Sequence, residues 1–270
     1  MKKKIIVPTD LTDAANQAIR QAVVIARKTE SSLTLLHVLD NKSASADDIR
    51  RNLQDEALKI RETSGLACET LFIEGQIFDI IPKSVCEKDY DLMVIGTHGL
   101  RGIWQFLFGA NILKLVAKIP IPVLVVQKES PLTDSFHRIV LPVSSHVNFQ
   151  SAVEAILIFA GIYKIEVHLY SVHKPGFIWS DQLLKNIEEA TRQFEAGGVK
   201  MLRVKEEQNV YSQGYAKQTL NYAHSIAADV IWMFSIPSQE DYYMAQTYKE
   251  SVLLNEFHIP VLCTGGETCT

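Results

Sequence analysis

The chain has 270 residues, of which 47% are apolar and 21% are charged, and its formal net charge at pH 7 is −4. This length suits two domains of roughly 130 residues better than one. The acidic balance, with residues 2–4 as the only basic block, excludes nucleic acid as an expected partner.

Membrane insertion and export are not expected. The apolar run at residues 5–7 is broken at once by Pro8, and nothing approaches the roughly 18 consecutive apolar residues of a membrane span. Four cysteines without paired or metal-ligand spacing are interpreted as reduced thiols: Cys68, Cys86, Cys263 and Cys269. The sequence therefore predicts a cytoplasmic protein with no metal site.

The first half of the chain alternates apolar strand patterns with amphipathic helix patterns. Thr12 is the expected N-cap of the first helix. Strands are predicted at residues 4–8, 33–39, 67–73, 92–95 and 121–126, with helices at about 13–26, 47–63, 77–88 and 111–118. This alternation predicts parallel βαβ units, in a flavodoxin-like α/β domain whose five-stranded sheet has helices on both faces.

A polar, proline-containing segment at residues 128–135 is predicted to be a linker, and a second copy of the pattern begins after it. RIVLP at residues 138–142 echoes KIIVP at 4–8, and DVIW at 229–232 echoes DLMV at 91–94. These correspondences keep their order, so we infer a tandem duplication with domains at residues 1–130 and 136–270.

Two loops of the first copy are candidates for a ligand site. One follows the first strand, and the other follows the fourth strand and ends at a helix N-terminus, where glycines and unpaired N–H groups favour phosphate binding. In open parallel sheets ligands bind beyond the carboxyl ends of the strands, where the strand order reverses. The second copy has no glycine in the equivalent of the second loop, so the site is assigned to the first copy. The candidate residues are Pro8, Thr9, Asp10, Gly96, Thr97, His98, Gly99, Gly109, Ala110 and Asn111.

The Pro-Thr-Asp loop, the three glycines and the closing PVLVV at residues 122–126 resemble the universal stress protein family. The resemblance covers the whole chain as a tandem pair of domains and implies the adenine nucleotide alpha hydrolase-like variant of the fold. In ATP-binding members the glycine motif ends in Ser or Thr, whereas this chain has Ala110. A hydrogen bond to a charged group contributes roughly 1.5 to 3 kcal/mol, so this departure weakens the expected affinity tenfold or more unless Asn111 compensates.

The resemblance also implies roles for individual residues. Gly96 and Gly99 carry the backbone around the phosphates, and Gly109 presents N–H groups at the helix start. Asp10 accepts hydrogen bonds from the ribose or adenine end, and the main chain of Val38 contacts adenine. The implied ligand is ATP, with Mg²⁺ on its phosphates. The implied assembly is an intramolecular pseudo-dimer that works with a protein partner or a further homo-oligomer.

Several alternatives stay open. The protein is a stress-response regulator that binds ATP, or a member without nucleotide that serves as a protein-interaction scaffold. An ATP hydrolase or kinase is weaker, because no catalytic lysine, arginine finger or base is identifiable, and at most weak ATP hydrolysis is expected. The glycines are alternatively ordinary turn residues, and Asp10 is alternatively a helix-capping residue. His98 is interpreted as a loop donor to phosphate and His37 as a core histidine.

Overall fold

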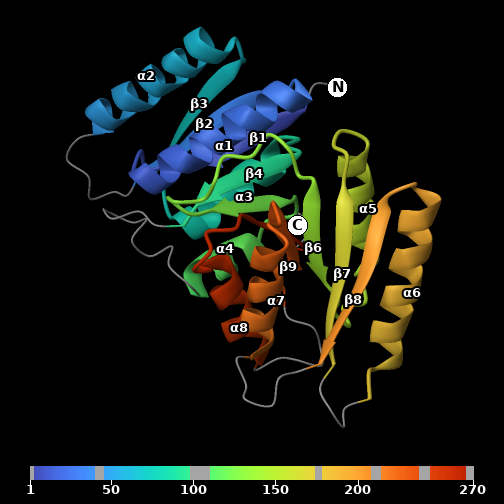
Figure 1. Ribbon diagram of the computed structural model, residues 1–270. Helices are drawn as coiled ribbons and strands as arrows, with labels where there is room; N and C mark the ends of the chain where they lie inside the picture. The colour runs from blue at the N-terminus through green and yellow to red at the C-terminus, as the bar shows by residue number, and fades with distance from the viewer. Residues whose placement is uncertain are drawn as a thin grey trace. The chain divides into compact units, whose positions relative to one another are not determined.

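The computed structural model describes residues 3–39, 46–97, 110–173, 178–207, 214–236 and 244–265. The chain divides into two compact units, which are taken separately (Figure 1). The N-terminal unit comprises Met1–Asp134 with Gly266–Thr270, and the C-terminal unit comprises Ser135–Gly265.

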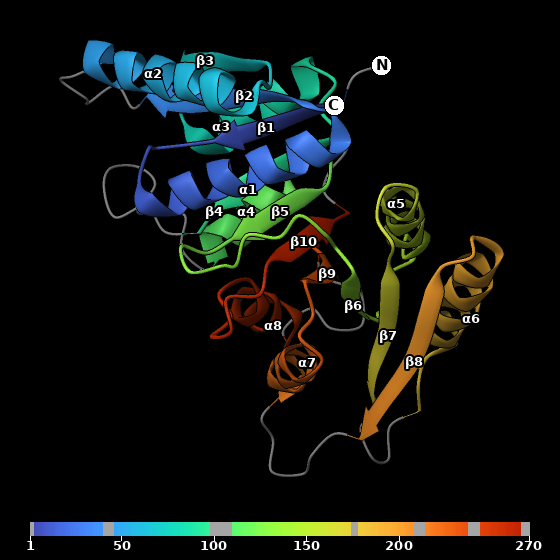
Figure 2. The ribbon, with the colours of Figure 1, turned by 45° about the horizontal axis from the view of Figure 1, so that its top comes forward.

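The N-terminal unit is a parallel sheet with helices on both faces. Its strands lie in the order β3-β2-β1-β4-β5, and every pairing described between them is parallel. Helices α1 and α2 pack together on one face, while α3 and α4 lie on the other (Figure 2). The elements are β1 (Lys4–Pro8), α1 (Asp13–Thr29), β2 (Ser32–Leu39), α2 (Ala46–Ser64), β3 (Cys68–Glu74), α3 (Ile77–Glu87), β4 (Leu92–Gly96), α4 (Ala110–Ala117) and β5 (Val123–Val126). The predicted fold class is confirmed.

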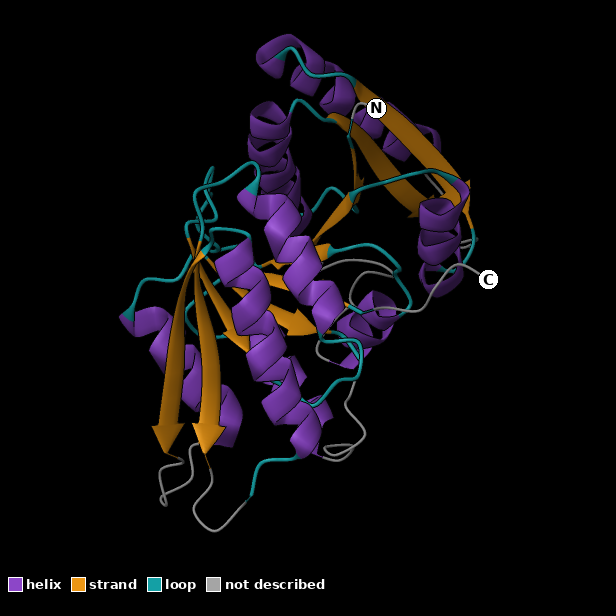
Figure 3. Cartoon of the chain, turned by 90° about the vertical axis from the view of Figure 1, so that its right-hand side faces the viewer, coloured by secondary structure: helices purple, strands orange, loops and turns teal. Residues whose placement is uncertain are grey.

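The C-terminal unit repeats this architecture. Its strands pair in parallel in the order β8-β7-β6-β9-β10. Counted from the first strand of the unit, this is third, second, first, fourth, fifth, as in the N-terminal unit. Strands lie between layers of helices, with α5 packed on α6 and α7 packed on α8 (Figure 3). The elements are β6 (Arg138–Pro142), α5 (Gln150–Ala160), β7 (Glu166–His173), α6 (Asp181–Ala196), β8 (Lys200–Glu207), α7 (Gly214–Ser225), β9 (Val230–Phe234), α8 (Met244–Leu253) and β10 (Val261–Thr264).

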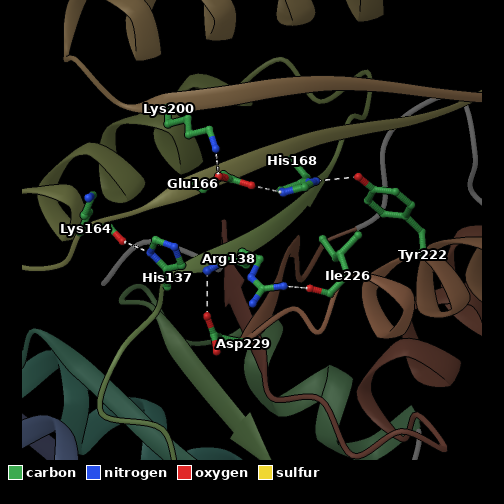
Figure 4. Close-up of polar contacts among 9 residues, drawn as sticks. All are labelled: His137, Arg138, Lys164, Glu166, His168, Lys200, Tyr222, Ile226 and Asp229. Carbon is green, nitrogen blue, oxygen red and sulfur yellow. Dashed lines mark hydrogen bonds and ion pairs between the residues drawn. The ribbon is translucent and has the colours of Figure 1, made fainter.

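In both units, equivalent hydrogen bonds join the start of the first strand to the residue just before the fourth strand. The backbone N–H of Lys4 donates to Asp91 Oδ2 at 2.8 Å, and the N–H of Arg138 donates to Asp229 Oδ2 at 2.7 Å (Figure 4). In return, the N–H of each aspartate donates to the carbonyl of its basic partner at 2.9 Å. The same reciprocal pair at the same place in both units supports the duplication inferred from the sequence.

A chain of polar contacts crosses the start of the second sheet. Glu166 lies between Lys200 of β8 and His168, whose Nε2 is 2.9 Å from Glu166 Oε1 (Figure 4). The other ring nitrogen of His168 is 2.6 Å from the hydroxyl of Tyr222 on α7. Hydrogen bonds from Lys200 and His168 hold the pKa of Glu166 below its usual value. These contacts hold α7 and β8 against β7 at the amino ends of the strands.

Thr12 is the N-cap residue of α1, as predicted, although its side chain makes no capping hydrogen bond. Its hydroxyl donates to Asp10 Oδ1 at 2.6 Å. The prediction that all four cysteines are reduced is wrong. Cys68 and Cys263 are free, whereas Cys86 is disulfide-bonded, because folding can pair thiols that sequence spacing does not associate.

No helix among the described residues is long and apolar enough to cross a membrane.

The segment predicted to be a linker is fastened to α1. Gln21 is 1% exposed and makes two hydrogen bonds to the backbone of Thr133, donating to its carbonyl at 2.7 Å and accepting from its N–H at 3.0 Å. One turn earlier on the helix, the amide of Gln17 donates to the carbonyl of Ser130. Buried side-chain amides therefore hold the end of the N-terminal unit in place.

Replacing Gln21 with Leu should lower the free energy of unfolding by about 1 to 3 kcal/mol, because both hydrogen bonds to Thr133 are lost inside a buried contact. Urea unfolding of the full chain would measure this. The matched control is Gln193→Leu on α6, where a half-exposed amide donates to Glu189. That change should cost no more than about 0.5 kcal/mol. Equal losses in the two variants would contradict the prediction.

Candidate functional site

The described starts of the two candidate loops lie at the carboxyl ends of β1 and β4. These strands are direct neighbours, with Ile5 opposite Leu92 and Ile6 opposite Met93. Strand order reverses between them, since β2 and β3 continue on one side and β5 on the other. Thr9 and Asp10 follow β1 at this edge, and Thr97 follows β4. The structure therefore brings these residues together at the switch point, where parallel sheets bind their ligands.

The loop after β1 is held by hydrogen bonds on both sides of Thr9. The N–H of Thr9 donates to the carbonyl of Leu36 at 2.8 Å, and its carbonyl lies 2.8 Å from Nδ1 of His37. Because a carbonyl can only accept, Nδ1 of His37 carries the proton. His37 is 7% exposed, and burial lowers its pKa, although the bond to Thr9 and the charge of Asp10 act in the opposite direction. The core histidine expected from the sequence is present, and it also supports the candidate loop.

Asp10 has one satisfied and one unsatisfied carboxylate oxygen. Its Oδ1 accepts from the N–H of Thr12 at 3.0 Å and from the Thr12 hydroxyl at 2.6 Å. Its Oδ2 is buried and has no hydrogen-bond partner among the described residues. Between the two residues Leu11 adopts a left-handed conformation, with φ of 61°. A buried acceptor without a partner carries a desolvation penalty that a ligand hydroxyl or amine would remove.

Gly96 is required by packing at the end of β4. A Cβ at this position would lie 2.4 Å from the carbonyl oxygen of Ala14, in the first turn of α1. The next residue, Thr97, is fully buried, and its N–H donates to the carbonyl of Val126 at 2.9 Å. Because Gly96 has no side chain, the first turn of α1 can pack against the end of β4. This packing role of Gly96 does not depend on a ligand.

Of the remaining residues predicted for the site, some are described in the structure and others are not. Pro8 ends β1, and Val38 is buried near the end of β2, opposite Ile73 of β3. Ala110 is the first residue of α4 and half-buried Asn111 is the second. His98, Gly99 and Gly109 lie outside the described residues.

In the C-terminal unit the equivalent loops are tied to each other. His146, in the loop after β6, places Nε2 2.7 Å from the carbonyl of Ile236, which follows β9. Its Nδ1 lies 2.6 Å from the hydroxyl of Ser144. The imidazole stacks on Phe234 at a centroid distance of 4.6 Å. A direct hydrogen bond therefore bridges the two loops at the carboxyl edge of this sheet.

Further contacts reinforce this bridge. The amide of Asn186, on α6, donates to the carbonyls of Ser144 and His146 at 2.8 and 2.9 Å. Lys249 of α8 is 5% exposed and also donates to the carbonyl of Ile236. Burial, and secondarily the charge of Lys249, lower the pKa of His146 to about 4. His146 is therefore neutral at pH 7, with Nε2 as its donor.

Among the described residues, no group of three or more His, Cys, Asp or Glu side chains could hold a metal ion.

Comparison with protein families assigns the N-terminal half of the chain. The model of the universal stress protein family matches residues 1–127. The N-terminal unit belongs to the universal stress protein family. A universal stress protein of Bacillus subtilis is 27% identical over 148 residues, which cover 47% of this chain and 100% of the relative. Another, from Methanocaldococcus jannaschii, is 29% identical over 140 residues, covering 47% of this chain and 82% of the relative.

The solved structures extend the likeness to both units. A universal stress protein from Archaeoglobus fulgidus superimposes with a TM-score of 0.73 and 19% identity, over 97% of this chain and 96% of its own. At this identity the likeness concerns the fold. Both units of the chain therefore have the universal stress protein fold.

Gly96→Ala should destabilise the N-terminal unit by about 1 to 3 kcal/mol, because the new Cβ meets a backbone carbonyl that cannot rotate away. Denaturant unfolding of the full chain provides the measurement. Gly161→Ala is the control, since its Cβ would lie 3.3 Å from the nearest atom. If Gly96→Ala is no more destabilising than the control, α1 does not approach β4 as described.

The bridge of the C-terminal unit predicts a pH dependence of stability. The folded-state pKa of His146 lies near 4, below the usual 6.5, so the unfolded chain takes up the proton more readily. The stabilising contribution is complete above pH 6.5 and is lost as pH falls toward 4, by about 3 kcal/mol. In His146→Gln the fall in unfolding free energy across this window should shrink by that amount.

The control for this pH experiment is His224→Gln, which removes an exposed imidazole from α7 of the same unit. It should retain the wild-type fall in stability between pH 6.5 and 4. A His146→Gln profile that coincides with the wild-type profile would show that His146 is not buried in the neutral form.

Proposed function

We propose that the N-terminal unit binds an adenine nucleotide, ATP, in the crevice between the loops after β1 and β4, and that the protein acts in stress-response regulation. The observation that carries this proposal is Asp10 Oδ2, a buried acceptor without a partner among the described residues, located at the switch point of the sheet. An adenine nucleotide supplies both ribose hydroxyls and an exocyclic amine as donors for such an oxygen.

The phosphate end of the ligand is assigned from sequence spacing. Gly96 and Gly99, then Gly109, form the pattern that resembles ATP-binding family members. Helix α4 begins at Ala110, directly after the last glycine, and its first N–H groups and dipole favour an anion. Mg²⁺ would arrive bound to the nucleotide phosphates.

The C-terminal unit is proposed to bind no nucleotide. Its two loops are bridged by His146 and Ile236, and Ser144, at the position equivalent to Asp10, is already hydrogen-bonded to His146. Its later loop has no glycine. One nucleotide per chain is therefore expected.

A protein-interaction scaffold without nucleotide is the second candidate function. Two observations favour it: the bridged crevice of the C-terminal unit, and Ala110 in place of the Ser or Thr of the motif. The unsatisfied oxygen of Asp10 opposes it, because a scaffold gains nothing from a buried acceptor without a partner.

Calorimetric titration of the full chain with Mg²⁺-ATP should show saturable binding of one nucleotide per chain. Asp10→Asn should weaken this binding tenfold or more, since a charge-assisted hydrogen bond contributes roughly 1.5 to 3 kcal/mol. Ala110→Ser should strengthen it by restoring the hydroxyl of the motif. Gly109→Val should abolish it.

The control for Asp10→Asn is Asp13→Asn, which removes the same charge three residues later, where the carboxylate is 73% exposed and pairs with Lys128 at 3.0 Å. This variant should bind ATP like the wild type. No saturable binding by the wild type at millimolar ATP would overturn the proposal and favour the scaffold. Unchanged binding by Gly109→Val would assign the phosphates to a different place.

A further inference from the structure

The side chain of His37 binds the loop after β1 at a backbone carbonyl that the pairing of β1 with β2 leaves free. The parallel ladder pairs β1 with β2 as far as Pro8 opposite Leu36, and the N–H of Thr9 extends it by one bond. The carbonyl of Thr9 accepts instead from the His37 side chain at 2.8 Å. The residue just before Asp10 is therefore fastened to β2 through both its N–H and its C=O.

The His37 ring is itself held in place. It stacks on Phe72 of β3 with a centroid distance of 5.6 Å and an interplanar angle of 15°. On α2, the guanidinium of Arg50 lies 4.7 Å from the centroid of the Phe72 ring. A ring packed in this way has one orientation, so its Nδ1–H is preorganised toward Thr9.

Asp10 follows this fastened residue directly. Its Oδ1 is engaged by the N–H and hydroxyl of Thr12, which fixes the plane of the carboxylate. The N–H of Leu11 donates to the Thr9 hydroxyl at 3.0 Å, so the whole turn is ordered by its own hydrogen bonds. What remains is Oδ2, buried and without a partner in the described part of the chain.

The C-terminal unit provides an internal comparison. Val143 occupies the position of Thr9, and its carbonyl is also held by a side chain, the hydroxyl of Tyr215 on α7 at 3.3 Å. Ser171 stands where His37 stands, one residue after the partner of Pro142, and donates to the carbonyl of Val204. At the Asp10 position Ser144 is already bonded to His146. At the position of Asp10, therefore, the N-terminal loop has an unsatisfied acceptor and the C-terminal loop does not. Among the described residues of the C-terminal unit, a buried acceptor without a partner lies instead at Oε1 of Gln150, where α5 begins.

We infer that His37 is a positioning residue, which orients Asp10 to accept a hydrogen bond from a ribose hydroxyl of the bound nucleotide. This inference rests on the proposed function and on the ribose contact that the family resemblance implies for Asp10, and adds to them the side chain that positions Oδ2. His37 does not touch the ligand. It acts through the carbonyl of Thr9.

The test compares two ligands and two matched variants of the full chain. His37→Phe keeps an aromatic ring for stacking on Phe72 but removes the donor to Thr9. Tyr215→Phe removes the equivalent donor to Val143 in the C-terminal unit. Each protein is titrated with Mg²⁺-ATP and with Mg²⁺-2′,3′-dideoxy-ATP, which lacks both ribose hydroxyls. The wild type should bind the dideoxy nucleotide about tenfold more weakly than ATP.

His37→Phe should bind ATP about tenfold more weakly than the wild type and dideoxy-ATP with unchanged affinity, because the bond that His37 supports is absent from that complex. Tyr215→Phe should match the wild type for both ligands. His37→Asn, whose amide can donate to the same carbonyl, should recover part of the preference for ATP. An equal loss of affinity for both nucleotides in His37→Phe, or no loss for either, overturns the positioning role.

Hydrogen exchange without nucleotide separates this inference from the proposed function. In His37→Phe the amides of Leu11 and Thr12 should exchange faster than in the wild type, while the amide of Leu35 in β2 keeps its rate. Unchanged exchange at both loop amides overturns the positioning role even if ATP binds. Faster exchange in a protein whose wild type binds no ATP overturns the ribose assignment and the proposed function, and leaves the support of the loop by His37 established.

Discussion

The first turn of α1 approaches the end of β4 so closely that the carbonyl oxygen of Ala14 lies 2.4 Å from the place where a Cβ on Gly96 would stand. This contact is possible only because residue 96 has no side chain. Ala14 follows Asp10 by four residues, so the same close approach brings the start of α1 against the end of β4 beside the candidate loop. The glycine is therefore needed by the scaffold before any phosphate is considered, and the candidate site is built on a packing constraint.

Two sheets of the same strand order carry different chemistry at their carboxyl edges. In the N-terminal unit the turn after β1 leaves one buried carboxylate oxygen of Asp10 without a described partner. In the C-terminal unit His146 bridges to Ile236 and satisfies Ser144. Most of the apolar core lies in the strands and helices, so the polar groups at either edge can differ while the strand order is kept. The two units thus differ at the residue that follows their first strand by two positions, where Asp10 keeps an acceptor without a described partner and Ser144 is hydrogen-bonded.

Most elements follow from local patterns. Buried parallel strands have continuous apolar runs, as in the IIVP of β1, and the helices between them have a repeat of three or four residues, so the ends of both were predictable to within three residues. Side-chain hydrogen bonds were not predictable. Thr12 is the N-cap of α1 as expected, but the sequence did not predict the hydrogen bond that its hydroxyl donates to Asp10. The hydrogen-bond partner of His37 could not be predicted from the sequence either, because Thr9 is 28 residues away in the chain.

By itself the sequence determined the class of fold, its duplication and the two loops that meet at the switch point, because periodicity and the connectivity of parallel βαβ units depend on neighbouring residues only. The tertiary structure decided which atoms in those loops are satisfied. The unsatisfied oxygen of Asp10, the steric need for Gly96 and the bridge from His146 to Ile236, across 90 residues, depend on distances between segments remote in the chain. A one-dimensional pattern does not contain such distances, since they are set by how helices and strands pack against each other.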